Sequence, residues 1–239
     1  MDPLMAAAVL LGYFVKGICG FANTLVFTTV MSFRMDNVNL SPIDLLVGFP
    51  ANLLMVWKER RHTRLRVWGP LAAMVVLGAV PGALLLKSGG AGMVKLGFGL
   101  MVVVLGAEML LRERRPATVG APRWALWLIG LLSGLLCGLY GVGALLAAYI
   151  GRTSENASQF RGDLCVVFTV DGAFRIALYS LMGILTVPAA LTALQLLPFM
   201  LAGMGLGVAV SRRASEKWVR RVVIVALIFS GVALILGNL

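Results

Sequence analysis

Long apolar runs separated by short polar breaks organise the whole chain. The runs cover residues 4–33, 43–57, 69–86, 92–111, 124–150, 164–183, 187–210 and 218–237, and Ser41–Pro42 is predicted as the break ahead of the second run. Each run is predicted to be a helix, because lipid offers no partner for unpaired backbone groups and no run shows strand-like alternation. A crossing needs roughly 20 apolar residues. The pattern therefore predicts an all-α, multi-pass integral protein of the inner (plasma) membrane.

Two of the runs, 4–33 and 124–150, are too long for one crossing and are interrupted by glycine. The glycines are Gly17 and Gly20 in the first run, and Gly138, Gly141 and Gly143 in the second. The two runs align at an offset of 121 residues. We predict one membrane domain of two repeats, residues 1–115 and 116–239, each with a broken segment followed by three ordinary helices. Glycine-broken helices at matching positions of inverted repeats are a transporter architecture.

The distribution of Lys and Arg predicts how the broken segments are placed. If every run crosses the membrane, nine basic residues face the cytoplasm and ten face outward. If each broken run is a re-entrant hairpin, sixteen face the cytoplasm, in loops 58–68, 112–123, 151–163 and 211–221. Arg34, Lys87 and Lys95 then remain outside. Only the hairpin arrangement satisfies the positive-inside rule, so we predict hairpins, inverted halves and extracytoplasmic termini.

Composition excludes several classes of protein. The chain is 60% hydrophobic and only 13% charged, with a mean hydropathy of +0.94, too little charge to cover a soluble domain. The net charge of +11 comes from residues between apolar runs, which membrane topology explains without nucleic acid. The three cysteines form no C-x-x-C pair and are expected to be buried. His62 is the only histidine, so no catalytic dyad, metal site or haem site is expected, and we predict a non-enzyme without cofactors.

Charged residues inside the apolar runs are the sharpest candidates for a binding site, because each costs at least about 2.5 kcal/mol at the bilayer centre. Apart from Glu108, which is close enough to the end of its run to reach the membrane interface, the candidates are Lys16, Asp171 and Arg175. The last two are four residues apart, so they share a helix face and can pair. A purely structural ion pair and a substrate site both remain open. The excess of positive charge favours an anionic substrate.

Other candidates lie on or near the broken segments. Glycine lets a ligand approach exposed backbone N–H groups, although close packing between helices also explains glycine in membranes. Asn23, Thr24 and Tyr149 could donate hydrogen bonds. Arg161, which follows the second broken segment, could bind the anion or anchor the helix at the membrane interface.

The sequence resembles the sulfite exporter TauE/SafE family of membrane permeases over nearly its whole length. The resemblance rests on Gly17-x-x-Gly20-Phe21-Ala22, on the glycine-rich stretch 134–143, and on Tyr149 with Phe160-Arg161-Gly162. The chain departs from the family at Ala144, where proline is frequent, and at Ala22-Asn23, where a second glycine is common. The resemblance implies export or uptake of small anions such as sulfite, thiosulfate, sulfonates or sulfoacetate, with Arg161 near the substrate.

Together these features predict a secondary anion transporter with its site between the two broken helices. The predicted substrate-binding residues are Lys16, Gly20, Asn23, Thr24, Gly141, Gly143, Tyr149, Arg161, Asp171 and Arg175. A proton or a sodium ion is the expected coupling ion, with Asp171 orienting Arg175 or relaying a proton, and the pattern is compatible with an oligomer. The alternative is a non-transporting membrane factor that assembles with another membrane protein.

Overall fold

The computed structural model describes residues 2–31, 34–35, 37–88, 103, 123–141, 143–215 and isolated positions between 218 and 232. Its helices are α1 (Pro3–Cys19), α2 (Asn23–Met31), α3 (Asn37–Glu59), α4 (Leu65–Ser88), α6 (Arg123–Tyr140), α7 (Ala144–Thr153), α8 (Ala157–Leu181) and α9 (Val187–Arg213). No strand occurs in the described part of the chain, which confirms the all-helical prediction. The runs predicted at 92–111 and 218–237 lie almost wholly outside the described residues.

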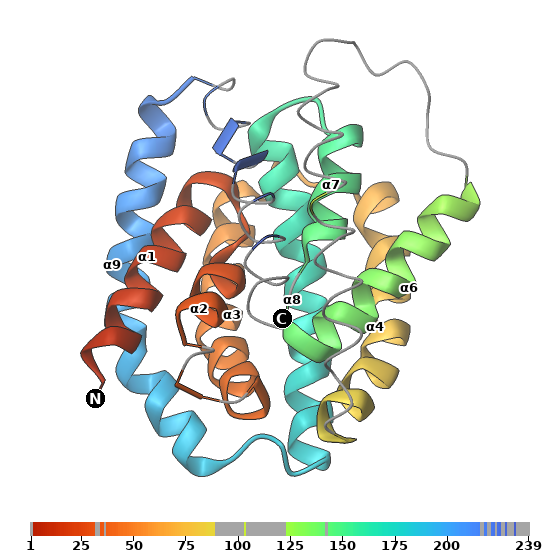
Figure 1. Ribbon diagram of the computed structural model, residues 1–239. Helices are drawn as coiled ribbons and strands as arrows, with labels where there is room; N and C mark the ends of the chain where they lie inside the picture. Colours follow the sequence, from red (N-terminus) through yellow and green to blue (C-terminus); the bar gives the residue numbers. More distant parts are fainter. Residues whose placement is uncertain are drawn as a thin grey trace.

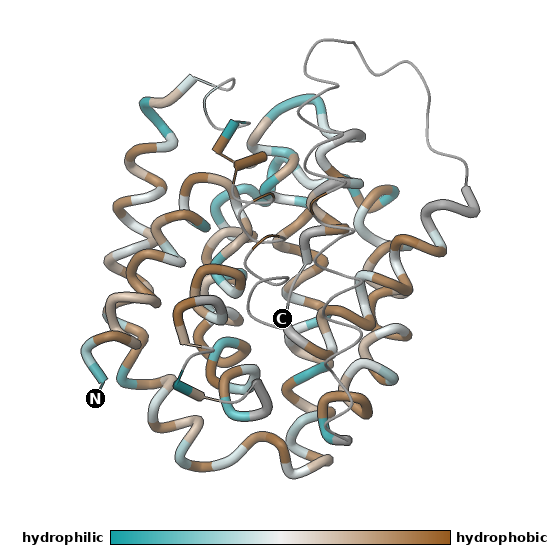
Figure 2. Tube along the Cα trace, viewed as in Figure 1, coloured by the Kyte–Doolittle hydropathy of each residue, from teal (hydrophilic) through white to brown (hydrophobic). Residues whose placement is uncertain are grey.

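Four of these helices are long and apolar enough to cross a bilayer. They are Asn39–Glu59, Leu65–Lys87, Ala157–Leu181 and Val187–Arg213, whereas Pro3–Cys19 and Trp127–Leu139 are apolar but shorter. Large apolar side chains such as Leu77, Leu194 and Leu206 are exposed on their outer faces, and Figure 2 shows hydrophobic residues along these helices. Such surfaces need lipid rather than water as solvent. The chain is a multi-pass membrane protein.

The helices are arranged around a central antiparallel pair, α3 and α8. The end of α3 meets the start of α8 through Glu59 and Arg161, and the start of α3 meets the end of α8 through Ser41 and Tyr179. Figure 1 shows α1 with α9 on one side of this pair and α4 with α6 on the other. Each glycine-broken segment therefore packs through its first helix against a helix from the other half of the chain.

Glycines let the flanking pairs approach closely. A Cβ atom on Gly17 of α1 would lie only 2.9 Å from the Cα of Gly207 in α9, and one on Gly82 of α4 would lie 3.0 Å from the Cα of Gly138 in α6. Small residues at such crossings bring the two backbones into van der Waals contact. Gly17 and Gly138 are therefore helix-packing residues, the alternative that the sequence left open.

The interruptions of the broken segments lie a few residues later than these packing glycines. Gly20 ends α1 in a left-handed conformation with φ of 88°, and its N–H donates to the carbonyl of Lys16 at 2.6 Å. Ala22 is also left-handed, at φ 75°, a strained angle for a residue with a Cβ atom. Gly141 plays the same part in the second segment, at φ 70°. Left-handed residues end helices, so both predicted interruptions are confirmed.

The start of α3 differs from the prediction. The helix begins at Asn37 and carries Pro42 and Pro50 inside it, so Ser41–Pro42 is not a break between elements. Proline is tolerated here because neighbouring groups in a membrane bundle can satisfy the freed backbone carbonyls. As a consequence Asp44, which the predicted run 43–57 placed at the edge of a helix, is in the body of α3.

The basic loops gather at one end of the bundle. Arg64, which follows α3, donates to the carbonyl of Thr153 at the end of α7 at 2.6 Å. Arg161 at the start of α8 donates to Ser211 at the end of α9. The opposite end is marked by Lys87, whose ammonium group donates to a carbonyl at the end of α8. Loops 58–68 and 151–163 and residues 211–213 therefore share one end.

Candidate functional site

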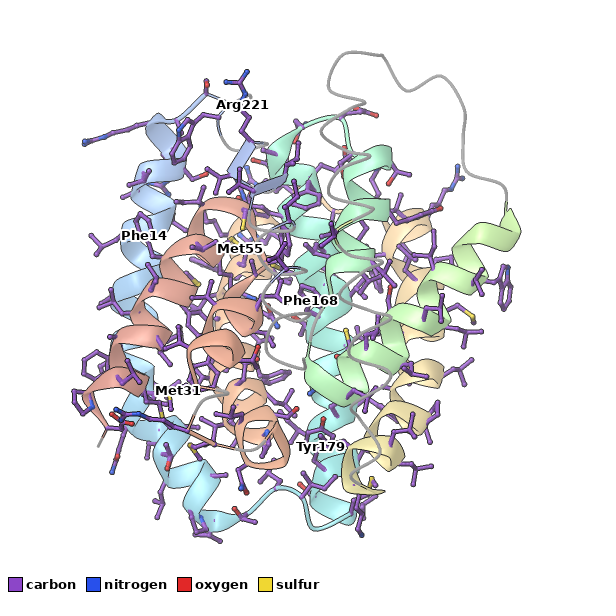
Figure 3. The ribbon with its side chains drawn as sticks, viewed as in Figure 1. Phe14, Met31, Met55, Phe168, Tyr179 and Arg221 are labelled. Carbon is purple, nitrogen blue, oxygen red and sulfur yellow. The ribbon has the colours of Figure 1, made fainter. Side chains whose placement is uncertain are left out.

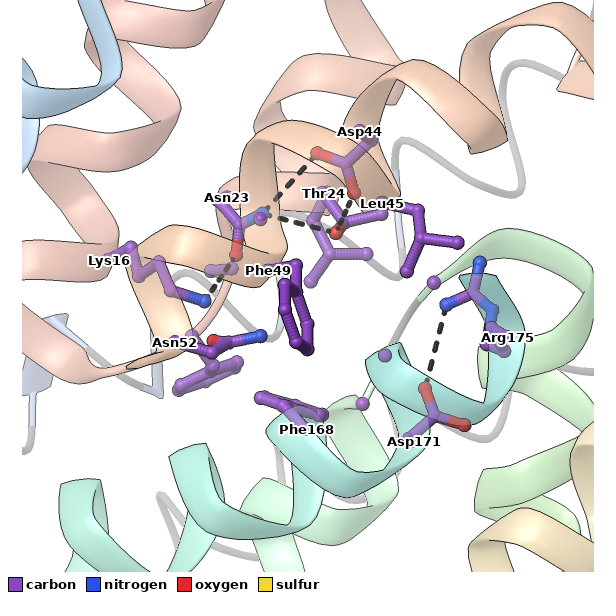
Figure 4. Close-up of a pocket in the computed structure, with 17 residues that line it drawn as sticks. Lys16, Asn23, Thr24, Asp44, Leu45, Phe49, Asn52, Phe168, Asp171 and Arg175 are labelled. Carbon is purple, nitrogen blue, oxygen red and sulfur yellow. Dashed lines mark hydrogen bonds and ion pairs between the residues drawn. The ribbon is translucent and has the colours of Figure 1, made fainter. Parts of the chain in front are cut away.

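A small polar cavity lies between the two interruptions, walled by α1, α2, α3 and α8 (Figure 4). Its volume is about 40 Å³, counted as the space that the centre of a water molecule can occupy. Seven of the ten predicted site residues line it: Lys16, Asn23, Thr24, Gly141, Gly143, Asp171 and Arg175. Figure 3 shows Phe168, which also lines it, near the middle of the bundle. The broken segments thus bring together polar groups separated by some 150 residues of sequence.

The first polar cluster joins α1, α2 and α3. The ammonium group of Lys16 donates to the side-chain oxygen of Asn23 at 3.0 Å and lies 5.6 Å from the centre of the Phe168 ring. The amide nitrogen of Asn23 donates to Asp44 Oδ1 at 3.3 Å, and the hydroxyl of Thr24 donates to Asp44 Oδ2 at 2.5 Å. All four polar side chains are buried. Asn23 therefore connects a buried cation to a buried carboxylate.

The second polar cluster lies on α8. Arg175 pairs with Asp171 at 3.6 Å, which confirms the predicted contact between them. Its other terminal nitrogen donates to the hydroxyls of Ser41, at 3.2 Å, and Tyr179, at 3.0 Å. Tyr179 in turn donates to the carbonyl of Gly138 at 2.7 Å. The guanidinium is thereby fixed to α3 and to the second broken segment at once.

The two clusters approach each other at Gly141. A Cβ atom at this position would lie 3.3 Å from the methyl group of Thr24, 3.4 Å from a terminal nitrogen of Arg175 and 3.5 Å from Asp44 Oδ2. The N-termini of α2 and α7 also meet the cavity here, at Asn23 and Gly143. The first backbone N–H groups of a helix have no partner within it and carry partial positive charge. Both half-helices therefore offer donors suited to a negative group.

Asp44 is the main feature that the sequence analysis missed, and it corrects the charge count. Among the described residues, the cavity is lined by two cations, Lys16 and Arg175, and by two carboxylates, Asp171 and Asp44. The expected excess of positive charge inside the membrane is therefore wrong. A lone aspartate within a predicted apolar run was the available signal, and the assumed break at Ser41–Pro42 obscured it.

Three of the six buried side-chain polar atoms that lack a partner in the described part of the chain belong to residues that line the cavity. Within the described part of the chain, Asn52 Oδ1, Asp171 Oδ1 and Arg175 Nε are buried and accept or donate no hydrogen bond. All three belong to residues that line the cavity. Unpaired buried polar groups are costly, which suits a site that holds water or a polar ligand.

Three predicted site residues do not line the cavity. Tyr149 is buried in the apolar core formed with α8. Arg161 lies at the end of the bundle, where it donates to Glu59 Oε1 at 3.1 Å, to Ser211 at 3.1 Å and to Ser158 at 3.3 Å. Gly20 lies against the side chain of Arg161. Arg161 is therefore part of an ion-paired group that joins α3, α8 and α9.

Comparison with known proteins gives the family. The model of the sulfite exporter TauE/SafE family matches residues 4–234, nearly the whole chain. The chain belongs to this family. No curated protein and no solved structure matches it. As a TauE/SafE member the protein is a membrane transporter of the sulfur-anion class rather than an enzyme, and the recognition made from the glycine motifs is confirmed.

Proposed function

We propose that the protein is a secondary transporter that carries small sulfur-containing or carboxylate anions across the inner membrane, with the anion bound in the cavity between the two interruptions. The proposal rests mainly on the buried position of Lys16 beside the cavity. Lys16 is 1% exposed and lines the cavity, and its ammonium group has no carboxylate within 4 Å among the described residues. A buried cation held only by an amide oxygen and an aromatic ring can be neutralised by a bound anion.

The size of the cavity favours a small anion. A water needs about 10–15 Å³ of such space, so 40 Å³ accommodates about three waters or one compact oxyanion. Sulfite, or the sulfonate or carboxylate end of a longer molecule, has these dimensions. The N-terminal N–H groups of α2 and α7 would share the remaining negative charge.

We also propose that residues 1–115 and 116–239 are inverted repeats whose broken segments are re-entrant hairpins. The helix contacts support this, because α1 packs on α9 just as α6 packs on α4, while α3 and α8 pair with each other. Asp2 before α1 contacts Arg34 after α2 at 3.0 Å, as expected for a hairpin that enters and leaves on one side. The gathering of basic loops at one end supports the same topology.

Transport is tested with purified protein in liposomes, by following labelled sulfite, thiosulfate and sulfoacetate. We expect saturable flux of at least one of them. Lys16→Gln should raise the anion concentration that gives half-maximal transport by about five- to a hundred-fold, because a hydrogen bond from a charged group to the anion, worth about 1–3 kcal/mol, is lost. Lys87→Gln, a change of a cation at the end of the bundle, is the matched control and should leave half-saturation unaltered. Well-folded protein that moves none of the three anions would refute the proposal.

Topology is tested by labelling single cysteines in a variant without Cys19, Cys137 and Cys165, which are all buried thiols. Cysteines placed in loop 58–68 and in 211–221 should both resist an impermeant external reagent. Labelling of one loop with protection of the other would show that the broken segments cross the membrane.

A further inference from the structure

Asp44 differs from the other carboxylate of the cavity in having no cationic partner. Asp171 is paired with Arg175 at 3.6 Å, whereas Asp44 has no Lys or Arg nitrogen within 4 Å among the described residues. Within the part of the chain that the structure describes, its oxygens accept from two neutral groups, the hydroxyl of Thr24 and the amide of Asn23. A buried carboxylate without a counter-ion binds a proton more readily than one that is paired with a cation. Of the two carboxylates in the cavity, Asp44 is therefore the better proton acceptor.

The groups that face Asp44 allow it to gain and lose a proton without rearrangement of the helices. From α1 come Lys16 and Tyr13, both reaching it through Asn23; from α8, Arg175 approaches across Gly141. The hydroxyl of Thr24 donates to the carboxylate and can accept from a carboxylic acid after rotation about its C–O bond. One hydroxyl therefore satisfies both protonation states of Asp44.

We propose that Asp44 carries a proton that moves in the same direction as the anion, so that the protein is a proton–anion symporter. This inference rests on the proposed function. An anion held by Lys16 adds a negative charge to the cavity that already contains Asp44, and like charges in one site raise the affinity of the carboxylate for a proton. By linkage, the proton raises the affinity for the anion by the same factor. The proton comes from water on the side where both bind, and returns to water where both leave.

The structure favours a proton over a sodium ion at this position. Both oxygens of Asp44 already accept hydrogen bonds from Thr24 and Asn23. The side-chain oxygen of Asn23, which also lies beside Asp44, accepts from the ammonium group of Lys16. A sodium ion would have to displace these donors and lie beside a lysine cation, whereas a proton needs neither change.

The experiment measures anion and proton together in wild-type liposomes that contain a pH-sensitive dye. An inward proton gradient should drive anion accumulation, an imposed anion gradient should acidify the lumen, and a sodium gradient should do neither. Wild-type anion affinity should rise about five- to 150-fold from alkaline to acidic medium. Asp44→Asn should lose both proton effects while still exchanging labelled for unlabelled anion across the membrane, and Asp44→Glu should retain them. Glu155→Gln, an exposed carboxylate outside the cavity, is the control.

Each outcome is decisive. Anion flux without proton movement in the wild type, or flux driven by sodium, would overturn this inference and leave the proposed function standing. Retention of proton-driven accumulation by Asp44→Asn would overturn the assignment to Asp44, and its loss in Asp171→Asn would transfer the role to that residue. Wild-type protein that neither moves nor binds any anion would overturn the proposed function, and this inference with it.

Discussion

The change Arg161→Lys distinguishes a residue that binds substrate from one that joins helices. The guanidinium donates to Glu59 Oε1 from two nitrogens, at 3.3 and 3.1 Å, and to the hydroxyls of Ser211 and Ser158. Glu59 is itself buried, 4% exposed. We therefore expect Arg161→Lys to lower stability and to leave anion affinity unchanged.

The magnitude follows from the bonds that are lost. A lysine ammonium keeps the charge near Glu59 but lacks the planar fork that reaches several acceptors at once. Loss of the two hydroxyl contacts, at about 0.5–1.5 kcal/mol each, predicts a loss of about 1–3 kcal/mol. For a chain of this length, that corresponds to a fall in melting temperature of about 2–12 °C.

The assay compares melting in detergent with concentration-dependent transport at matched protein levels. The half-saturation of Arg161→Lys should equal that of the wild type. The double variant Glu59→Gln/Arg161→Gln should melt above Arg161→Gln, because the single change leaves a buried carboxylate whose remaining basic neighbours among the described residues are Lys58 and His62, each at 3.7 Å. An affinity loss of about 1–3 kcal/mol corresponds to a five- to hundred-fold higher anion concentration at half-maximal transport. Such a rise with an unchanged melting temperature would refute this reasoning and show that Arg161 binds the substrate.

Two further predictions concern the bundle. Asp171→Asn should destabilise the protein more than Asp171→Asn combined with Arg175→Gln, because only the single change strands a buried cation; additive losses in melting temperature would show that the pair does not interact. Gly207→Leu should abolish the folded, monodisperse protein, because even a Cβ atom at this position would meet the backbone of α1. Gly205→Leu on the same helix should fold normally, because nothing lies within 4 Å of its Cβ position. Equal behaviour of the two variants would contradict the packing described for α1 and α9.

The sequence predicted the helical membrane class and the two interruptions because both leave local signals. Apolar runs of crossing length need no knowledge of neighbours, and left-handed turns draw glycine, as at Gly20 and Gly141. The pairing of Asp171 with Arg175 was also local, since it depends on a spacing of four residues along one helix.

The remaining features depend on contacts between distant segments. Asp44 gains its significance only when α3 lies against α2, where Thr24 and Asn23 reach it. Arg161 was expected near the substrate from its place after the second broken segment, but its position is fixed by Glu59, more than 100 residues earlier. Hydropathy patterns contain no information on such pairings.

The close contact of α1 with α9 has a consequence for the biogenesis of the protein. Gly17 meets Gly207, so the ribosome must add about 190 residues before the partner of α1 exists, which takes roughly 10–40 s at the usual rate of synthesis. During that interval the glycine face of α1 is in the membrane without its native neighbour. Early insertion intermediates should therefore depend on lipid or on an insertase to shield this face, and completion of the fold should wait for the last third of the chain.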